Sequence, residues 1–91
     1  MDIKDFLQDI EHEEIEVNFT NGDITAVFNF TVDEIEIYED AIILKDSAFK
    51  PLKLHRENIR IDEEGKGEYI ITYPDSQAEK FSTVLVIKII D

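Results

Sequence analysis

The chain contains no cysteine and few basic residues, and both shortages exclude classes of structure and function. Without cysteine there are no disulfides, no thiolate metal sites and no cysteine nucleophile. The 91 residues include only 9 Lys and Arg against 22 Asp and Glu, which gives a formal net charge of −13. This charge argues against direct binding to nucleic acid or to an anionic membrane, because their phosphates would be repelled.

Long apolar runs and targeting signals are also missing. No apolar segment approaches the length that spans a membrane, and the segment from Met1 to Asp5 does not have the character of a signal peptide. We therefore expect a cytoplasmic protein that has no membrane partner.

The residues that are abundant favour a folded β protein. The hydrophobic fraction of 43% is ordinary for a globular chain, so the high charge does not imply disorder. Isoleucine leads the apolar residues, with valine and phenylalanine behind it, and all three favour strands. A chain of this length forms one small domain, here residues 1–91.

The segment from Glu13 to Val32 carries the strongest structural signal. Apolar and polar residues alternate on both sides of Asn21-Gly22, a dipeptide typical of the two-residue loop of a β-hairpin. The alternation gathers the apolar residues on one face, which we expect to be core beneath an acidic outer face. The predicted cross-strand pairs are Phe19 with Ile24, Val17 with Ala26, and Ile15 with Phe28, and Phe30 lies on the same face.

Other segments complete the expected fold. The apolar spacing between Asp2 and His12 predicts a short helix, with Asp2 as its N-cap. The alternation changes phase at Asp33-Glu34, which indicates a bulge, a bend or a turn. The final strand, about residues 81–90, is apolar on both faces, so its second face needs a cover, which the helix or an oligomer partner could supply. That second face carries Val84, Val86 and Ile90.

These signals predict a mainly β fold, that is, a β-rich α+β domain. A small antiparallel barrel and a two-sheet sandwich fit about equally well, each with about six or seven strands and a short N-terminal helix. An open sheet crossed by one helix is the third possibility.

Charge is distributed unevenly along the chain. The part from Met1 to Leu44 has 13 acidic residues and one basic residue, Lys4, and carries −12. The part from Lys45 to Asp91 carries −1 and begins with a basic stretch. The basic stretch can neutralise the acids within one monomer, or pair between monomers, or leave an acidic surface open for a basic partner.

This asymmetry provides the candidate partner-binding residues. The first set is an acidic face made of Glu14, Glu16, Asp23, Glu34 and Glu36. The second set is a basic and apolar stretch made of Phe49, Lys50, Lys53 and Arg56.

No recognisable motif for catalysis or for a cofactor is present, and we expect neither. His12, Glu14 and Glu16 would share a face of a strand, but the spacing lacks the second histidine of a zinc-binding helix, so no metal site is predicted. His55 has no nucleophile in a known motif beside it. Gly65-Lys66-Gly67 is a turn and is too short for a phosphate loop.

We therefore expect a small, acidic, non-enzymatic binding or regulatory module that acts through contact with a protein partner or with itself. The alternative is a nucleic-acid mimic, for example a viral inhibitor, whose carboxylates occupy the basic groove of a nucleic-acid-binding protein. A small-ligand barrel is a third, weaker hypothesis.

Overall fold

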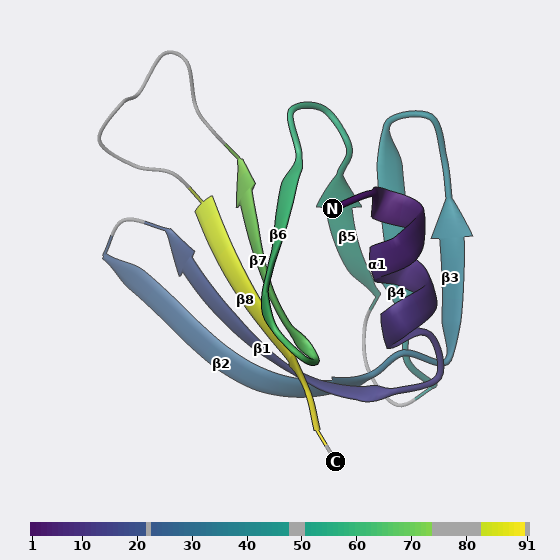
Figure 1. Cartoon of the computed structure of the whole chain (residues 1–91), viewed down its shortest axis with the longest axis horizontal. Coiled ribbons are helices and arrows are strands. Elements are labelled where there is room, and N and C mark those ends of the chain that lie inside the picture. The colour runs from purple at the N-terminus through teal and green to yellow at the C-terminus, as the bar shows by residue number, and fades with distance from the viewer. Residues whose placement is uncertain (22, 48–50, 74–82, 91) are drawn as a thin grey trace.

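The computed structural model describes residues 1–21, 23–47, 51–73 and 83–90, and it is built from one helix and eight strands in these ranges (Figure 1). Five strands form one antiparallel sheet in the order β2-β1-β8-β7-β6, and three form a second in the order β3-β4-β5. The elements are α1 (Ile3–Ile10), β1 (Glu14–Asn21), β2 (Ile24–Thr31), β3 (Glu34–Ile37), β4 (Ala41–Lys45), β5 (Leu52–His55), β6 (Arg60–Gly65), β7 (Glu68–Tyr73) and β8 (Thr83–Ile89).

The mainly β fold with an N-terminal helix is confirmed, and the arrangement is that of a sandwich rather than a closed barrel. The described strands number eight instead of about six or seven. Two of them, β3 and β5, are only four residues long, and both pair with β4. In Figure 1 the five-stranded sheet curves across the left of the view, and the three-stranded sheet stands on the right with α1 in front of it.

The predicted β1–β2 hairpin is present, but its register differs from the prediction. Asn21 pairs with Ile24, so Asn21 belongs to the strand ladder instead of to the loop. The observed pairs are Phe19 with Ala26, Val17 with Phe28, and Ile15 with Phe30. Because the slip is two residues, each side chain keeps its predicted face.

The predicted core of this hairpin is only partly buried. Ile15, Val17 and Phe30 are buried, whereas Ile24 is 66% exposed and Phe28 is 38% exposed. The physical reason is that the second layer covers only one end of β2, because the chain leaves the five-stranded sheet after Thr31. The other end of β2 therefore has no layer over it among the described residues.

The helix is present as predicted, although it ends at Ile10 rather than at His12, and it covers a different face from the one considered. The Asp2 side chain accepts a hydrogen bond from the Lys4 N–H at 3.1 Å and caps the helix. Phe6 meets the ring of Tyr69 edge to face, with the ring centroids 5.1 Å apart. Tyr69 pairs with Ile87, so α1 lies over the inner face of the five-stranded sheet. The outer row of β8 remains uncovered by α1, and Val86 is 38% exposed.

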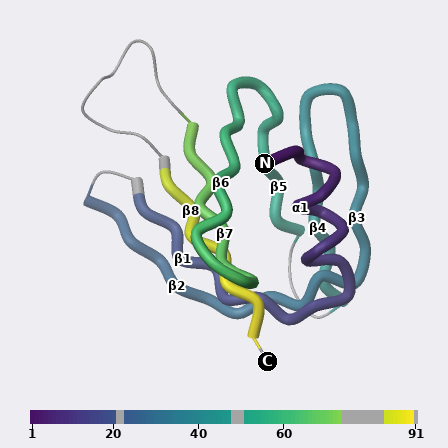
Figure 2. The backbone as a smooth tube through the Cα atoms, in the orientation of Figure 1, coloured from purple at the N-terminus to yellow at the C-terminus, as the bar shows by residue number. Residues whose placement is uncertain are grey.

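The phase change at Asp33-Glu34 corresponds to a bend where the chain passes from one sheet to the other. The Val32 N–H donates to the Glu13 carbonyl at 2.9 Å, still on the side of β1. The next N–H, that of Asp33, donates to the Lys45 carbonyl at 2.9 Å, on the side of β4. Figure 2 shows the chain running on from β2 into β3 along the bottom of the view. Bends of this kind form the corners of two-sheet structures.

Candidate functional site

Strand β2 is an unusual sheet edge because it carries no charge. It belongs to the longest segment of the chain without a charged residue, the nine residues 24–32, although 34% of all residues are charged. Uncharged, exposed edge strands are ready to pair with another chain, and proteins ordinarily protect them. Ile24, Val27 and Phe28 on β2 are all exposed, Val27 to 58%.

The other three sheet edges carry the usual protection. Strand β6 carries charged residues and a bulge between Glu63 and Gly65. Strands β3 and β5 are only four residues long, and each carries charge, as at Glu34 and Lys53. Short length, charge and bulges all discourage pairing with another chain. Strand β2, with eight residues, has none of these features.

The backbone groups on the free side of β2 can be identified from its hydrogen bonds. The Thr31 N–H points away from β1, because it donates to the Asp46 carboxylate at 2.8 Å. Backbone groups alternate in direction along an antiparallel strand, so those of Thr25, Val27 and Asn29 point the same way. No described residue pairs with these N–H and C=O groups. The edge thus presents three donors and three acceptors in a row.

The free edge begins where the ladder with the β4 chain stops. The Lys45 carbonyl accepts the Asp33 N–H, and beyond it side chains replace the backbone ladder. The Asp46 carboxylate accepts a hydrogen bond from the Thr31 N–H, and the Ser47 N–H donates to the Asp33 carboxylate at 2.9 Å.

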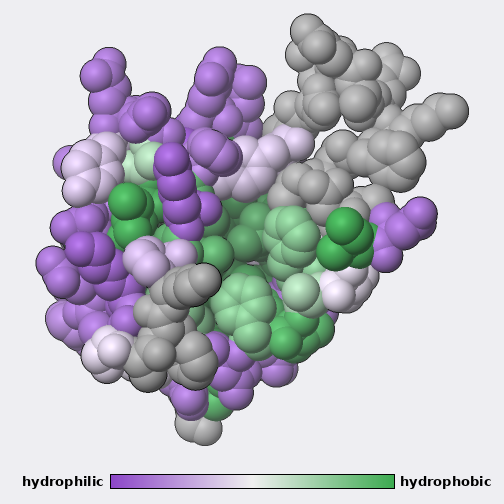
Figure 3. Space-filling view, turned by 180° about the vertical axis from the view of Figure 1, so that it is seen from behind, coloured by the Kyte–Doolittle hydropathy of each residue, from purple (hydrophilic) through white to green (hydrophobic). Residues whose placement is uncertain are grey.

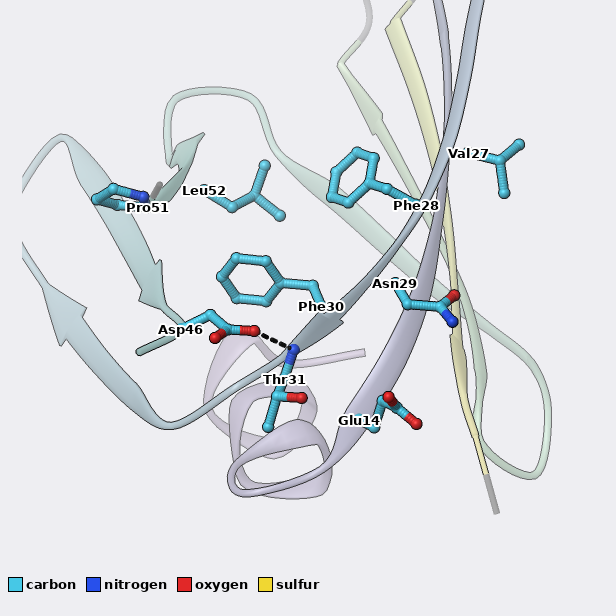
Figure 4. A pocket seen from close by; sticks show the side chains of 9 residues that line it. All are labelled: Glu14, Val27, Phe28, Asn29, Phe30, Thr31, Asp46, Pro51 and Leu52. Atoms are coloured by element: carbon cyan, nitrogen blue, oxygen red, sulfur yellow. Dashed lines mark hydrogen bonds between the residues drawn. The ribbon is translucent and has the colours of Figure 1, made fainter. Parts of the chain in front are cut away.

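An apolar groove of about 940 Å³ lies beside this edge. Figure 4 shows Phe28 and Phe30 facing Leu52 and Pro51 across the groove, while Val27 points away. The charged groups among the lining residues are two carboxylates. Figure 3 shows hydrophobic residues gathered in the middle of the face seen from behind, with hydrophilic residues on its flanks. The lining residues are Glu14, Val27, Phe28, Asn29, Phe30, Thr31, Asp46, Pro51 and Leu52.

The predicted acidic residues do not form a single row. Glu14 lines the groove, and Glu16 is exposed two residues further along β1. Asp23 is exposed in the turn between β1 and β2. Glu34 and Glu36 belong to β3 in the other sheet, on the right of Figure 1, far from the hairpin tip on the left. The five acids are thus divided among three places.

One of these acids is neutralised within the monomer. Glu36 Oε2 lies 3.1 Å from Lys45 Nζ, and the Tyr38 hydroxyl donates to Glu36 Oε1 at 3.1 Å. The hydrogen bond from Lys45, with a second from Tyr38, holds the pKa of Glu36 below its ordinary value. The same bonds raise the pKa of Lys45 and that of Tyr38.

Replacement of Lys45 by glutamine is expected to return the pKa of Glu36 towards its ordinary value. A carboxyl whose pKa is lowered by folding stabilises the protein above its unfolded pKa, and this contribution disappears as the pH falls through the folded pKa. The stabilisation should therefore vanish only at acidic pH, and it should be smaller in Lys45→Gln, where the Tyr38 hydrogen bond to Glu36 remains. NMR titration of the Glu36 carboxyl measures the shift, and Lys53→Gln is the control. Identical Glu36 titration in Lys45→Gln and wild type would contradict the assignment.

The basic stretch is only partly described by the structure. Phe49 and Lys50 lie outside the described residues. Lys53 is exposed on β5. Arg56 has a structural role, since its Nη1 donates to the Tyr38 carbonyl at 2.9 Å and its N–H donates to the Asp40 carbonyl at 3.1 Å. Arg56 thus joins the end of β5 to the β3–β4 turn.

In the part of the chain that the structure describes, the other polar side chains do not converge on a reactive centre. His12 lies in the turn before β1 with φ 65°, so it does not continue the strand face of Glu14 and Glu16 as the prediction assumed. Burial and a 2.7 Å hydrogen bond to Asp9 raise the pKa of Tyr69, and burial raises the pKa of Tyr73 to about 12. In the described ranges, no three His, Asp or Glu side chains are grouped to hold a metal.

Sequence reasoning did not single out β2 as an exposed, uncharged sheet edge, although the signal was present. It treated Ile24 and Phe28 as core and looked for a site among the charges. The length of the uncharged segment would have been informative, because edge strands are ordinarily charged. What the sequence did not show was that β2 ends its sheet, which depends on β8 pairing with β1.

Within the described ranges, no helix is long and apolar enough to cross a membrane. Comparisons of the chain with protein-family models, curated proteins and solved structures find no match.

Proposed function

We propose that this chain is a non-enzymatic binding module that engages another protein chain by strand addition at the free edge of β2. The observation that carries the proposal is that this edge is long, uncharged and unpaired among the described residues, whereas the other edges are short or charged. In strand addition, main-chain hydrogen bonds provide affinity, and pockets for alternate side chains provide specificity. Strand β2 offers both, the first along Thr25 to Asn29 and the second in the groove of Phe28 and Phe30.

The strand that pairs with β2 can come from a partner or from a second copy of the chain. Two copies related by a twofold axis could pair β2 with β2, since a twofold interface uses the same patch on both molecules. The net charge of −13 on each copy opposes this arrangement. Light scattering over a range of protein and salt concentrations distinguishes the two forms of the proposal.

The variant Val27→Pro tests the proposal. The Val27 N–H points away from β1, so proline removes no hydrogen bond of the described sheet. It does remove a donor that an added strand needs, and edge strands tolerate proline. Peptides selected from an unbiased library on the wild-type protein are expected to lose at least about tenfold in affinity for Val27→Pro. Val27→Ala, which keeps the N–H, should retain most of the affinity. Failure to enrich any peptide, or equal binding to Val27→Pro, would contradict the proposal.

Nucleic-acid mimicry has less support. A mimic needs carboxylates in rows that imitate a phosphate backbone. The candidate acids are divided between β1, the hairpin turn and β3, and Glu36 is paired with Lys45.

A further inference from the structure

We infer that the strand accepted by β2 is an extended, cationic segment of a partner protein, with apolar side chains alternating with Lys or Arg. This inference rests on the proposed function and adds the chemistry of the partner. An added strand would extend both faces of the sheet at β2, and the chemistry of the partner is inferred from the difference between these two faces.

The groove side of the added strand would be apolar. Side chains of a strand alternate between faces, so every second residue of the partner would share the face of Phe28 and Phe30. Leu52 and Pro51 lie across the groove from these two rings (Figure 4). Residues two apart in the partner would therefore pack between β2 and the start of β5, and apolar side chains suit this space.

The other residues of the added strand would extend the outer face, where acids lie nearest. In register, Glu16 is beside Asn29 and Glu14 is beside Thr31. A partner residue level with Asn29 would stand about 10 Å from Glu16, two strand spacings away, within reach of a Lys or Arg side chain. Neither β1 nor β2 contains a basic residue. The first base across the sheet is Lys88, beyond Glu16, and its Nζ lies 3.7 Å from Glu68.

The charges also argue against a second copy as the partner. Pairing β2 with β2 would place the Glu14 and Glu16 side chains of two molecules around one interface, and each molecule carries −13. Like charges across an interface are unfavourable, whereas a cationic segment would be attracted from a distance. Charge complementarity therefore favours the cationic partner.

Designed peptides test the inference on the full chain. The probe is a short synthetic peptide of alternating valine and lysine, and its affinity is measured by titration calorimetry at low and high salt. Two matched peptides each carry one change. The first has glutamate in place of lysine, and the second has N-methyl groups on the alternate backbone nitrogens that would face β2. We expect either change to weaken binding at least about tenfold, and salt to weaken the binding of the lysine peptide.

Protein variants locate the binding. Glu16→Gln should weaken the binding of the lysine peptide. Glu34→Gln, which removes an equal charge from β3, should weaken it less. Val27→Pro should abolish binding. If Val27→Pro binds the lysine peptide normally, the peptide is held by the acidic surface in general, and the inference is overturned.

Other outcomes separate the inference from the proposed function. Equal affinity for the lysine and glutamate peptides, with both lost in Val27→Pro, would overturn the cationic partner and leave strand addition standing. A dimer of the free chain that Val27→Pro dissociates would make a second copy the partner and overturn the inference in the same way. Absence of binding to the lysine peptide, with no peptide enriched from the unbiased library, would overturn both.

Discussion

Replacement of Phe6 by alanine is expected to lower the free energy of unfolding by about 3–5 kcal/mol. Phe6 is fully buried in α1, and it packs against the Tyr69 ring between the helix and the five-stranded sheet. Domains of ordinary stability unfold with only about 5–15 kcal/mol, so this single change would consume a large share of the total. Denaturant unfolding followed by circular dichroism measures the loss.

Tyr69→Phe is the control for this prediction. It keeps the ring contact with Phe6 and removes only the hydroxyl that donates to Asp9 at 2.7 Å. Its cost should be about 1.5 kcal/mol, the low end of the range for a hydrogen bond to a charged group, because Asp9 is exposed. If Phe6→Ala costs no more than Tyr69→Phe, then α1 does not close the core in the way the structure indicates.

The second large effect is expected from Phe28→Asp, which should weaken binding of the lysine peptide by about 30-fold. An aromatic side chain in the centre of an interface commonly contributes about 2 kcal/mol or more, which corresponds to that factor. Phe28 is 38% exposed, faces the groove and offers its ring to the added strand. The new carboxylate would also be desolvated by any apolar side chain that enters the groove.

Val86→Asp is the matched control, because Val86 is also 38% exposed but lies on the outer face of β8. Both variants add one negative charge, so any change in peptide affinity caused by long-range electrostatic attraction should be the same in both. Only Phe28→Asp should lose affinity, with Phe28→Ala intermediate, provided that unfolding curves show all three proteins folded. Equal losses in Phe28→Asp and Val86→Asp would show that the groove does not hold the peptide.

The sequence was sufficient to predict most of the secondary structure. The alternation of apolar residues predicted the β1–β2 hairpin, and the helical spacing with Asp2 predicted α1. The phase change indicated the bend after Thr31. These predictions succeed because each depends on contacts between residues close in sequence.

Register and burial were harder to predict, because they depend on distant segments. A slip of two residues in the hairpin preserves every face, so the apolar pattern could not detect it. The exposure of Ile24 and Phe28 depends on where the second layer lies, and neither residue carries that information. The candidate site was missed for the same reason, since the free edge of β2 exists only because β8 pairs on the other side of β1.

The hydrogen bond between the Thr31 N–H and the Asp46 carboxylate has a consequence for any strand added at β2. Because the Thr31 N–H is already engaged, an added strand would pair with Thr25, Val27 and Asn29 and end before Thr31. This hydrogen bond therefore limits how far along β2 an added strand can pair.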